Sequence, residues 1–247
     1  MNLRLIHKLS IIIPCYNEET TIEVIIKEIL EVNLGNTKKE IIVIDDSSTD
    51  ASPNIIRKLS REHSEIKGIY LKENEGKGAA VKRGIIQSTG DVVIIQDADR
   101  EYDPRDYLKM LIIFREDRAE VVFGSRFIGG NPRRIGYLSN RLANKLMTRF
   151  SALLSGLYVS DIHTCYIMFD GKWIRRVAPS LKSRGFGFNP EIVARLSKEK
   201  EAVRICEIGI SYYSRTKKEG KKIGIKDGIE AMWLIFKYNV LPFNWDD

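Results

Sequence analysis

Residues 91–104 read DVVIIQDADREYDP, in which an apolar run passes directly into three acids, Asp97, Asp99 and Glu101. A short apolar run bounded by polar residues is typical of a buried strand. Carboxylates at the edge of a core cost free energy unless a cation, a cationic side chain or water compensates them. The stretch therefore predicts a buried strand that ends at a charged site.

The same alternation of strand and helix patterns recurs along the chain. We expect strands at residues 9–14, 40–45, 67–71, 91–96, 119–124 and 203–213. We expect helices at residues 18–32, 47–62, 77–88, 104–116, 136–156, 188–200 and 225–239. Strands that are apolar throughout and alternate with helices predict an α/β fold, with a parallel sheet covered on both faces. We expect the second half to pack on the same sheet.

Composition narrows the class of protein. The 247 residues, 43% of them hydrophobic, suit one large or two small globular domains. Three widely separated cysteines, Cys15, Cys165 and Cys206, argue against a disulfide framework or a zinc site and indicate a reducing compartment. The net charge of +7 favours an anionic partner, such as nucleic acid, a phosphorylated ligand or an anionic membrane. Basic and acidic residues are interleaved and no RNA-binding motif is present, so we expect no nucleic acid.

Three polar clusters follow predicted strands: PCYNEE, DDSSTD and QDAD. Ligands of parallel sheets bind beyond the carboxyl ends of the strands, where these clusters would meet. Each cluster alone is equally explained by helix capping, with Asp50 or Ser48 at the second helix. Together, however, the acids would repel one another, and the spacing D-x-D-x-E suits Mg²⁺ or Mn²⁺ that shares its other positions with phosphates. We therefore predict a metal–diphosphate site.

Two other classes of protein, P-loop nucleotide-binding proteins and receiver signalling domains, account for fewer of these motifs. The segment NEGKGAA, residues 74–80, lacks the spacing of a phosphate-binding P-loop, and we interpret it as a glycine turn before a helix. The paired acids of IIVIDD also resemble those of a receiver signalling domain. Such a domain would be about half this length and would leave QDAD and GSRF unexplained.

The motifs SIIIPCYNEE, IIVIDDSSTD, NEGKGAA, QDAD and GSRF, in this order, resemble those of family 2 glycosyltransferases. The chain is similar in particular to the polyprenyl-phosphate sugar transferases, the dolichol-phosphate mannose and glucose synthases. The similarity continues through residues 161–169, 185–198 and 210–233, and so covers nearly the whole chain. It implies a GT-A fold, with a Rossmann-like, mostly parallel sheet and helices on both faces. It also implies inverting transfer of a hexose from GDP-mannose or UDP-glucose to a polyprenyl or dolichyl phosphate, with Mg²⁺ or Mn²⁺.

The resemblance also implies roles for individual residues. The base and ribose of the nucleotide would bind at Pro14, Tyr16, Glu18 and Asp46. The metal would bind at Asp97, Asp99 and Glu101. The diphosphate would be reached by Arg126, Arg215 and Lys221. Of these residues, Asp99 and Arg126 are the expected catalytic ones.

The acceptor decides between two reactions. A lipid monophosphate is already ionised and needs only a cationic pocket, whereas a sugar hydroxyl needs a general base. The stretch NPRRIGYLSNR, residues 131–141, offers a candidate pocket in Arg133, Arg134, Ser139 and Asn140. A solvated basic loop would explain it as well. Asp161 could be the base for the alternative reaction, transfer to a saccharide hydroxyl in polysaccharide or glycan synthesis. A structural anchor before the segment TCY, residues 164–166, explains this residue better.

Two stretches combine cationic and apolar residues: residues 141–158, and residues 231–245 with Trp233 and Trp245. Each could lie at a membrane surface or pack in the core. We found no signal peptide and no spanning segment. We therefore expect a catalytic domain at residues 1–225 and an amphipathic helix and tail at 226–247. We also expect a cytoplasmic protein held peripherally on the cytoplasmic face of a membrane.

Overall fold

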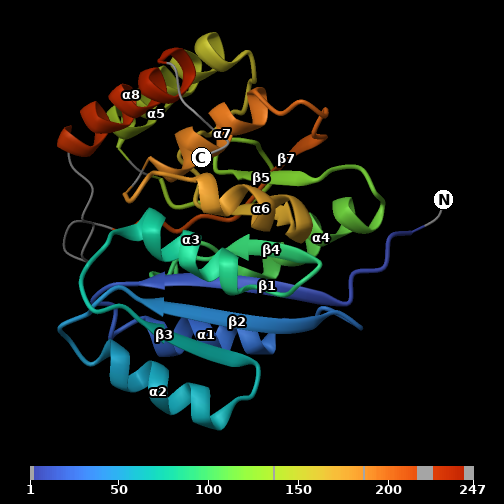
Figure 1. The fold of residues 1–247 in the computed structure, drawn as a ribbon, viewed down its shortest axis with the longest axis vertical. Helices are drawn as coiled ribbons and strands as arrows, with labels where there is room; N and C mark the ends of the chain where they lie inside the picture. Colours follow the sequence, from blue (N-terminus) through green and yellow to red (C-terminus); the bar gives the residue numbers. More distant parts are fainter. Residues whose placement is uncertain (1–2, 136, 186, 216–224, 242–247) are drawn as a thin grey trace.

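The computed structural model describes residues 3–135, 137–185, 187–215 and 225–241, and has a central sheet with helices on both faces (Figure 1). The strands are β1 (Lys8–Cys15), β2 (Lys38–Asp45), β3 (Ile66–Tyr70), β4 (Val92–Ile95), β5 (Val121–Ser125), β6 (Ile167–Asp170) and β7 (Ile205–Gly209). The helices are α1 (Ile22–Glu31), α2 (Ser52–Glu62), α3 (Lys77–Gln87), α4 (Tyr107–Arg115), α5 (Leu138–Ser155), α6 (Gly171–Val177), α7 (Phe188–Ser197) and α8 (Ile225–Val240). Short 3₁₀ turns, η1 and η2, cover Pro104–Asp106 and Ala178–Ser180.

The sheet is mixed and mostly parallel. Within the described residues its strand order is β3-β2-β1-β4-β6-β5-β7. β6 runs antiparallel to β4 and β5, while the other neighbouring strands are parallel. The expected mostly parallel sheet is confirmed, but the antiparallel strand β6, which has only four residues, was not predicted. The other predicted strands and helices are present, and both halves of the chain contribute to the same sheet, as predicted.

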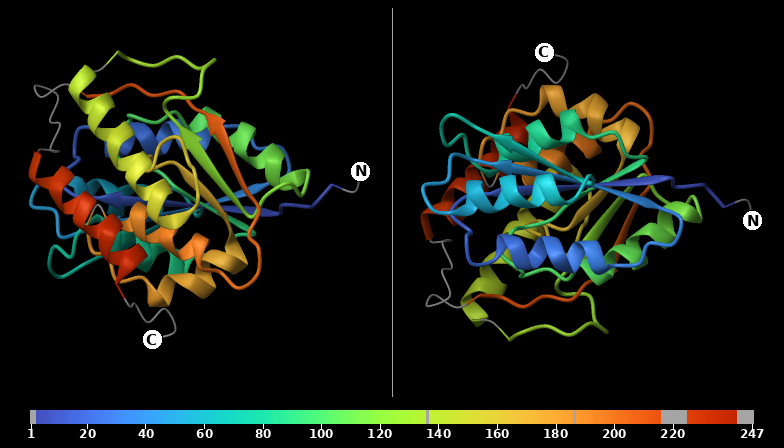
Figure 2. Two further views of the ribbon diagram at one scale, coloured as in Figure 1. Left: turned by 90° about the horizontal axis from the view of Figure 1, so that it is seen from above. Right: turned by 90° about the horizontal axis from the view of Figure 1, so that it is seen from below.

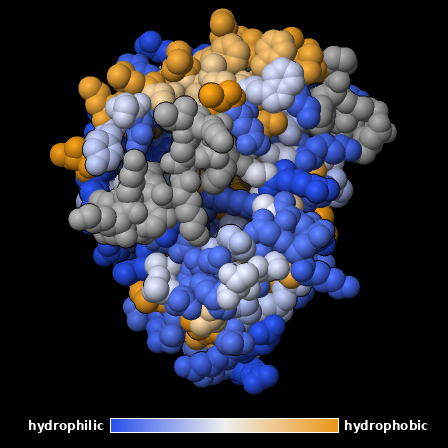
Figure 3. Space-filling view, turned by 90° about the vertical axis from the view of Figure 1, so that its left-hand side faces the viewer, coloured by the Kyte–Doolittle hydropathy of each residue, from blue (hydrophilic) through white to orange (hydrophobic). Residues whose placement is uncertain are grey.

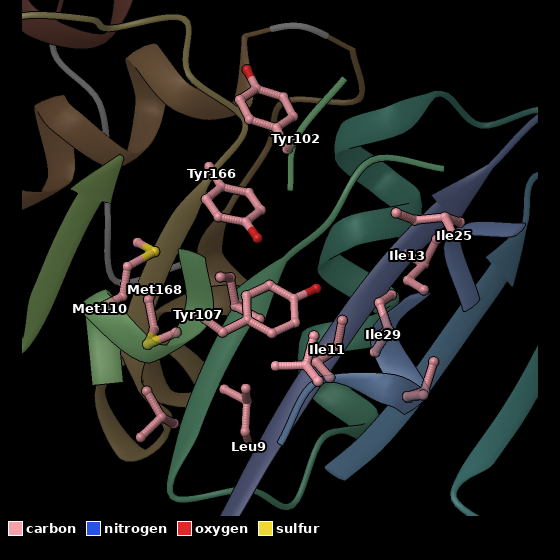
Figure 4. Packing of buried hydrophobic residues seen from close by; sticks show 14 of the residues in the cluster. Leu9, Ile11, Ile13, Ile25, Ile29, Tyr102, Tyr107, Met110, Tyr166 and Met168 are labelled. Carbon is pink, nitrogen blue, oxygen red and sulfur yellow. The ribbon is translucent and has the colours of Figure 1, made fainter. Parts of the chain in front are cut away.

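Burial on both faces explains why the strands are apolar throughout. Helices α1 and α4 cover one face, and α3 and α6 cover the other (Figure 2). Successive residues of β1 alternate between the two layers, as the pleat requires. Leu9, Ile11 and Ile13 pack with α1 in one cluster (Figure 4), whereas Ile12 packs with α3 in the other.

Helices α5 and α8 lie side by side beyond the sheet, at the top of Figure 1. They contact each other and α7. Of the predicted C-terminal part, 226–247, the structure describes the residues up to Leu241. The division of the chain at residue 225 stays a prediction, and Trp245 lies outside the described residues.

Close packing of α3 on the sheet leads to a stability prediction. A Cβ atom at Gly84 would lie 2.5 Å from Ile12 Cγ2 and 2.6 Å from Ile44 Cδ1. Overpacking of this kind costs roughly 1–3 kcal/mol, so we expect Gly84→Ala to lower the free energy of unfolding measured by urea titration.

Gly228 in α8 is the matched control, because a Cβ atom there would have no neighbour within 4 Å. We expect Gly228→Ala to raise the free energy of unfolding by up to about 1 kcal/mol, through helix propensity. Unchanged stability of the Gly84 variant would contradict the close approach of α3 to the sheet.

Candidate active site

Three loops meet where β1, β2 and β4 end. These strands are adjacent and parallel, so the stretches PCYNEE, DDSSTD and QDAD lie at one edge of the sheet, as predicted. Each loop contains a non-glycine residue with a left-handed backbone: Asn17 (φ 53°), Ser47 (φ 61°) and Arg100 (φ 61°). Such residues cost free energy and are enriched at functional sites. Asp117 (φ 53°), in the turn after α4, is a further example away from this edge.

Hydrogen bonds connect the loops after β1 and β2. The backbone N–H groups of Asn17 and Glu18 donate to the hydroxyls of Ser48 and Ser52, each over 3.0 Å. Asp50 accepts from the N–H of Ser52, the first residue of α2, but the N-cap position is Ala51 and no side chain caps the helix there, so the predicted capping by Asp50 or Ser48 was wrong. The two loops therefore form a connected scaffold.

The side chains predicted to bind the base and ribose differ in their surroundings. Tyr16 is exposed, whereas Pro14 and Glu18 are partly buried. The carboxylate of Asp46 is buried and accepts from the backbone N–H groups of Glu75 and Gly76, at 2.8 and 2.9 Å. It therefore holds the glycine turn in place, and its contact with a base stays a prediction.

Asp45, which the sequence analysis did not select, is also buried, but its Oδ1 atom has no hydrogen-bond partner. A buried carboxylate oxygen without a donor is costly. Of these two acids, Asp45 is therefore the one with a carboxylate oxygen that receives no hydrogen bond from the described residues. The sequence does not indicate which of the adjacent acids, Asp45 or Asp46, has its carboxylate bound by backbone N–H groups of the protein.

Two cations of the chain itself compensate the acids after β4. Lys77 Nζ lies 2.5 Å from Asp97 Oδ1, and Arg215 Nη2 lies 2.8 Å from Asp99 Oδ2. Arg215 also pairs with Glu18, its Nη1 lying 3.1 Å from Glu18 Oε2. Lys77 was not predicted to be a site residue. Its position could have indicated this role, because it is the first residue of a helix that starts at the sheet edge where the acids lie.

Glu101 has a different environment from the other two acids. Its carboxylate accepts from the hydroxyl of Tyr212 and from the backbone N–H of Arg215, both at 2.6 Å. It therefore fixes the segment after β7 that carries Arg215. The predicted metal-binding role of Glu101 stays a prediction.

Charge repulsion persists in this cluster. Burial raises the pKa of the Asp99 carboxyl to about 7, and the neighbouring charges of Asp97 and Glu101 add to that shift. Burial alone would lower the pKa of Lys77, but the Asp97 carboxylate beside it raises that pKa above its ordinary value. A further cation near Asp99 would therefore stabilise the ionised carboxylates.

The donor atoms fit a divalent metal. Among the described residues, no group of three or more His, Cys, Asp or Glu side chains is arranged to hold one. Mg²⁺ and Mn²⁺, however, are commonly held by one or two carboxylates together with substrate phosphates and water. Asp97 and Asp99 supply such hard oxygen atoms, and the raised pKa of Asp99 marks a position where positive charge is favourable.

Arg126, the predicted phosphate contact in GSRF, forms an ion pair with a buried acid of the protein, Asp161. Its Nε and Nη2 atoms lie 2.7 and 2.8 Å from the two carboxylate oxygens of Asp161. Asp161 is fully buried and also accepts from Asn144 Nδ2. Burial alone would lower the pKa of Arg126, yet the Asp161 charge raises it well above its ordinary value. Contact of Arg126 with a phosphate stays a prediction.

The basic segment before α5 lies against the segment after β7. The backbone N–H of Arg134 donates to the Tyr212 carbonyl, and Arg134 Nη1 donates to the Ser214 carbonyl over 3.1 Å. Arg133 Nη1 donates to the Arg126 carbonyl. Ser139 and Asn140 are exposed in the first turn of α5. Lys221 lies outside the described residues.

A cavity of about 550 Å³ brings parts of both predicted subsites together. It is lined by Thr20, Thr21, Asp99, Arg100, Arg134, Tyr213 and Arg215. A predicted metal ligand and a predicted acceptor-binding arginine thus share one cavity. Its cationic and carboxylate walls suit a phosphorylated ligand together with a metal.

Comparison with known proteins identifies the class. The family described as "Glycosyl transferase family 2" matches residues 10–177, which is more than half of the chain, and the chain belongs to this family. It is therefore a glycosyltransferase.

Two curated relatives are similar in sequence. A dolichyl-phosphate beta-glucosyltransferase of Dictyostelium discoideum is 28% identical over 229 residues, which cover 87% of this chain and 68% of the relative. A dolichol-phosphate mannosyltransferase of Pyrococcus furiosus is 32% identical over 123 residues, which cover 50% of this chain and 34% of the relative.

Solved structures support the fold. The glucosyl-3-phosphoglycerate synthase of Mycobacterium tuberculosis, solved with Mn²⁺, UDP and glucosyl-3-phosphoglycerate, gives a TM-score of 0.71 at 18% identity. The match covers 96% of this chain and 81% of that one. The same synthase was also solved with Mg²⁺ and UDP, at a TM-score of 0.70. The prediction of a GT-A fold is confirmed.

The raised pKa of Asp99 leads to a pH prediction for the metal-free protein. The folded-state value of about 7 exceeds the ordinary value of 3.8, so the folded state binds this proton more tightly than the unfolded state. The free energy of unfolding then falls as pH rises from about 4 to about 7. In EDTA, we expect Asp99→Asn to be more stable than the wild type at pH 8, by roughly 2–4 kcal/mol, and equally stable near pH 4.

Asp103→Asn is the control, because the pKa of Asp103 is shifted in the opposite direction to that of Asp99. Burial would raise the pKa of Asp103, but hydrogen bonds from Arg105 hold it below its ordinary value. We therefore expect this variant to be less stable than the wild type at neutral pH, with the difference disappearing as the acid is protonated. Both comparisons use thermal or urea unfolding at several pH values. Identical pH profiles for wild type and Asp99→Asn would exclude the assigned repulsion.

Proposed function

We propose that this glycosyltransferase moves a hexose from a nucleotide diphosphate sugar, GDP-mannose or UDP-glucose, to a polyprenyl or dolichyl phosphate, with inversion and with Mg²⁺ or Mn²⁺. The observation that carries the proposal is the shared cavity, which joins Asp99 to Arg134 and Arg215. The curated relatives, named as dolichyl-phosphate glucosyl- and mannosyltransferases, support this substrate class. The UDP, Mn²⁺ and Mg²⁺ in the neighbouring structures support the donor and the metal.

In this reaction the bond between the anomeric carbon and the diphosphate breaks, and an oxygen of the lipid phosphate forms the new bond to that carbon. The nucleoside diphosphate leaves with the bonding electron pair and gains negative charge. A divalent metal held by Asp97 and Asp99 would supply positive charge to the leaving diphosphate. Arg215, which lines the cavity and whose guanidinium pairs with Asp99 and Glu18, would turn to the same oxygens.

The choice of a phosphate acceptor rests on Asp161. A saccharide hydroxyl would have to lose a proton to a base, and Asp161 was the candidate. Both of its carboxylate oxygens are bound by Arg126, and one also accepts from Asn144. A carboxylate held in this way is a poor base, because its charge is already compensated. A lipid phosphate needs no base, and the arginines beside the cavity suit its charge.

A lipid acceptor also implies a location. Among the described helices, none is long and apolar enough to cross a membrane. The proposal therefore includes peripheral attachment to the cytoplasmic face, where nucleotide sugars would be available.

The decisive experiment is a donor screen. Purified protein is incubated with GDP-mannose, UDP-glucose or UDP-N-acetylglucosamine, a polyprenyl phosphate, and Mg²⁺ or Mn²⁺, and the lipid product is identified by mass. We expect a glycosylated lipid phosphate from one hexose donor. Transfer to soluble saccharides alone would support the alternative, a family 2 enzyme acting on a saccharide hydroxyl.

Removal of the proposed metal ligands tests the donor site. We expect Asp97→Asn and Asp99→Asn to lower the transfer rate by about 10²–10³-fold or more, and EDTA to stop transfer by the wild type. Glu116→Gln, an acid at the end of α4, is the matched control and should transfer normally. Full wild-type activity in EDTA would disprove the metal assignment.

Charge reversal at the basic segment tests the acceptor site. We expect Arg133→Glu combined with Arg134→Glu to reduce transfer to a lipid phosphate at least about tenfold more than metal-dependent hydrolysis of the donor. The two rates are measured in parallel on the same preparation. Equal losses in both rates would place these arginines on the donor side instead.

A further inference from the structure

Helix α5 buries polar side chains and exposes leucines. Its three buried residues are Asn144, Thr148 and Ser151, and Ser151 is only 1% exposed. Leu138 and Leu153, by contrast, are 69% and 80% exposed. The amphipathic helices of soluble proteins normally turn their apolar stripe to the core. Met147, Phe150 and Leu154 of α5 are partly buried against the core, so the exposed leucines form a second apolar stripe on the outer side. This second stripe indicates an apolar partner outside the described chain.

These leucines belong to a larger surface, which we call the apolar cap. Its exposed members are Ile135, Tyr137, Leu138, Leu142, Leu146, Leu153 and Tyr158 in and around α5, and Ile229 and Trp233 of α8. Figure 3 shows the hydrophobic surface at the top of the molecule, above the hollowed polar region at the edge where β1 and β2 end. Clusters of this kind, unlike single exposed residues, mark interaction surfaces.

The charges within the apolar cap favour one partner. Arg141, Lys145 and Arg149 are exposed between the leucines, and residues 138–155 contain no acid. Glu230 of α8, beside Ile229, is an exposed acid within the cap, so its basic charges lie on α5. A basic helix with an apolar stripe is typical of a segment that lies in the interface of an anionic bilayer. Tyr137, Tyr158 and Trp233 add aromatic rings, which favour the same interface. A second copy of the chain would bring like charges together at this surface.

We propose that the apolar cap docks on an anionic lipid membrane and presents the cavity at Asp99 to the membrane surface. The choice of a lipid occupant rests in part on the proposed lipid-phosphate acceptor. Continuity along the chain adds a further argument, because α5 follows directly after the segment with Arg133 and Arg134. Arg134 lines the cavity, so a lipid phosphate beside the cap would lie near the cationic end of the proposed active site.

Vesicle sedimentation tests the docking. Wild-type protein is mixed with phosphatidylcholine vesicles, with and without phosphatidylglycerol, at low and high salt. We expect binding to the anionic vesicles that weakens with salt. We expect Leu142→Asp combined with Leu146→Asp to weaken binding more than tenfold, since each buried leucine contributes a factor of about ten or more. Lys145→Gln combined with Arg149→Gln should weaken binding to anionic vesicles by roughly fivefold per charge.

Ile112→Asp is the matched control, because Ile112 is 49% exposed on α4 and lies outside the apolar cap. It should bind vesicles like the wild type, and circular dichroism should be unchanged in all variants. Equal loss in the control and the leucine variant, or no loss in either, would overturn the proposal. Concentration-dependent dimers that the leucine variant abolishes, without vesicle binding, would assign the cap to a second copy instead.

A second readout separates this proposal from the proposed function. Transfer to a short, water-soluble isoprenoid phosphate should be unchanged in the leucine variant, while transfer to a long-chain polyprenyl phosphate in vesicles should fall. Vesicle binding through the cap, with no transfer to any isoprenoid phosphate, would overturn the proposed acceptor and leave the docking surface standing. Normal transfer to the long-chain lipid in vesicles by the leucine variant would overturn the docking surface alone.

Discussion

The charge balance at the end of β4 is the interaction on which the site depends. Asp97, Asp99 and Glu101 follow a buried strand, and their repulsion must be compensated for the fold to be stable. Lys77 and Arg215 provide this compensation from opposite parts of the chain, one at the start of α3 and the other after β7. The same two contacts therefore connect the glycine turn and the segment after β7 to the acids, and the acidic cluster can exist in a folded protein before any ligand arrives.

The features predicted correctly from the sequence are those that depend on short-range patterns of residues. Apolar runs with β-branched residues located six of the seven described strands, because both faces of the sheet are covered. β6 escaped prediction because four residues, IMFD, give no period, and its antiparallel direction depends on packing between β4 and β5. The convergence of three loops at one edge was predictable from the parallel order of β1, β2 and β4. The sequence did not predict which carboxylate oxygens accept hydrogen bonds from the protein, because their donors come from distant parts of the chain. Asp46 and Asp161 are bound in this way, whereas one oxygen of Asp45 has no partner among the described residues.

The orientation of helix α5 could not be predicted from the sequence either. Its sequence mixes leucines with arginines and lysines, and this pattern was compatible with core packing or with a membrane surface. Periodicity identifies an apolar face but cannot tell which direction that face points. The tertiary structure decides it, because Asn144 of α5 donates to the buried Asp161, and Met147, Phe150 and Leu154 pack against the core on the inner side. These contacts leave Leu142, Leu146 and Leu153 facing outward.

The direction of β6 also affects how the cleft can change shape. Because β6 is antiparallel to β4, the chain enters the sheet at the edge where the neighbouring strands end, and Cys165 lies there beside Lys77, the partner of Asp97. This segment is held by hydrogen bonds: the N–H of Cys165 donates to the Tyr102 hydroxyl, and the Tyr166 hydroxyl donates to the Asp103 carbonyl. The segments that carry Arg134 and Ser214, by contrast, lie outside the sheet and are hydrogen-bonded to each other. We therefore expect these two segments to shift more easily than residues 161–166 when ligands of different size bind.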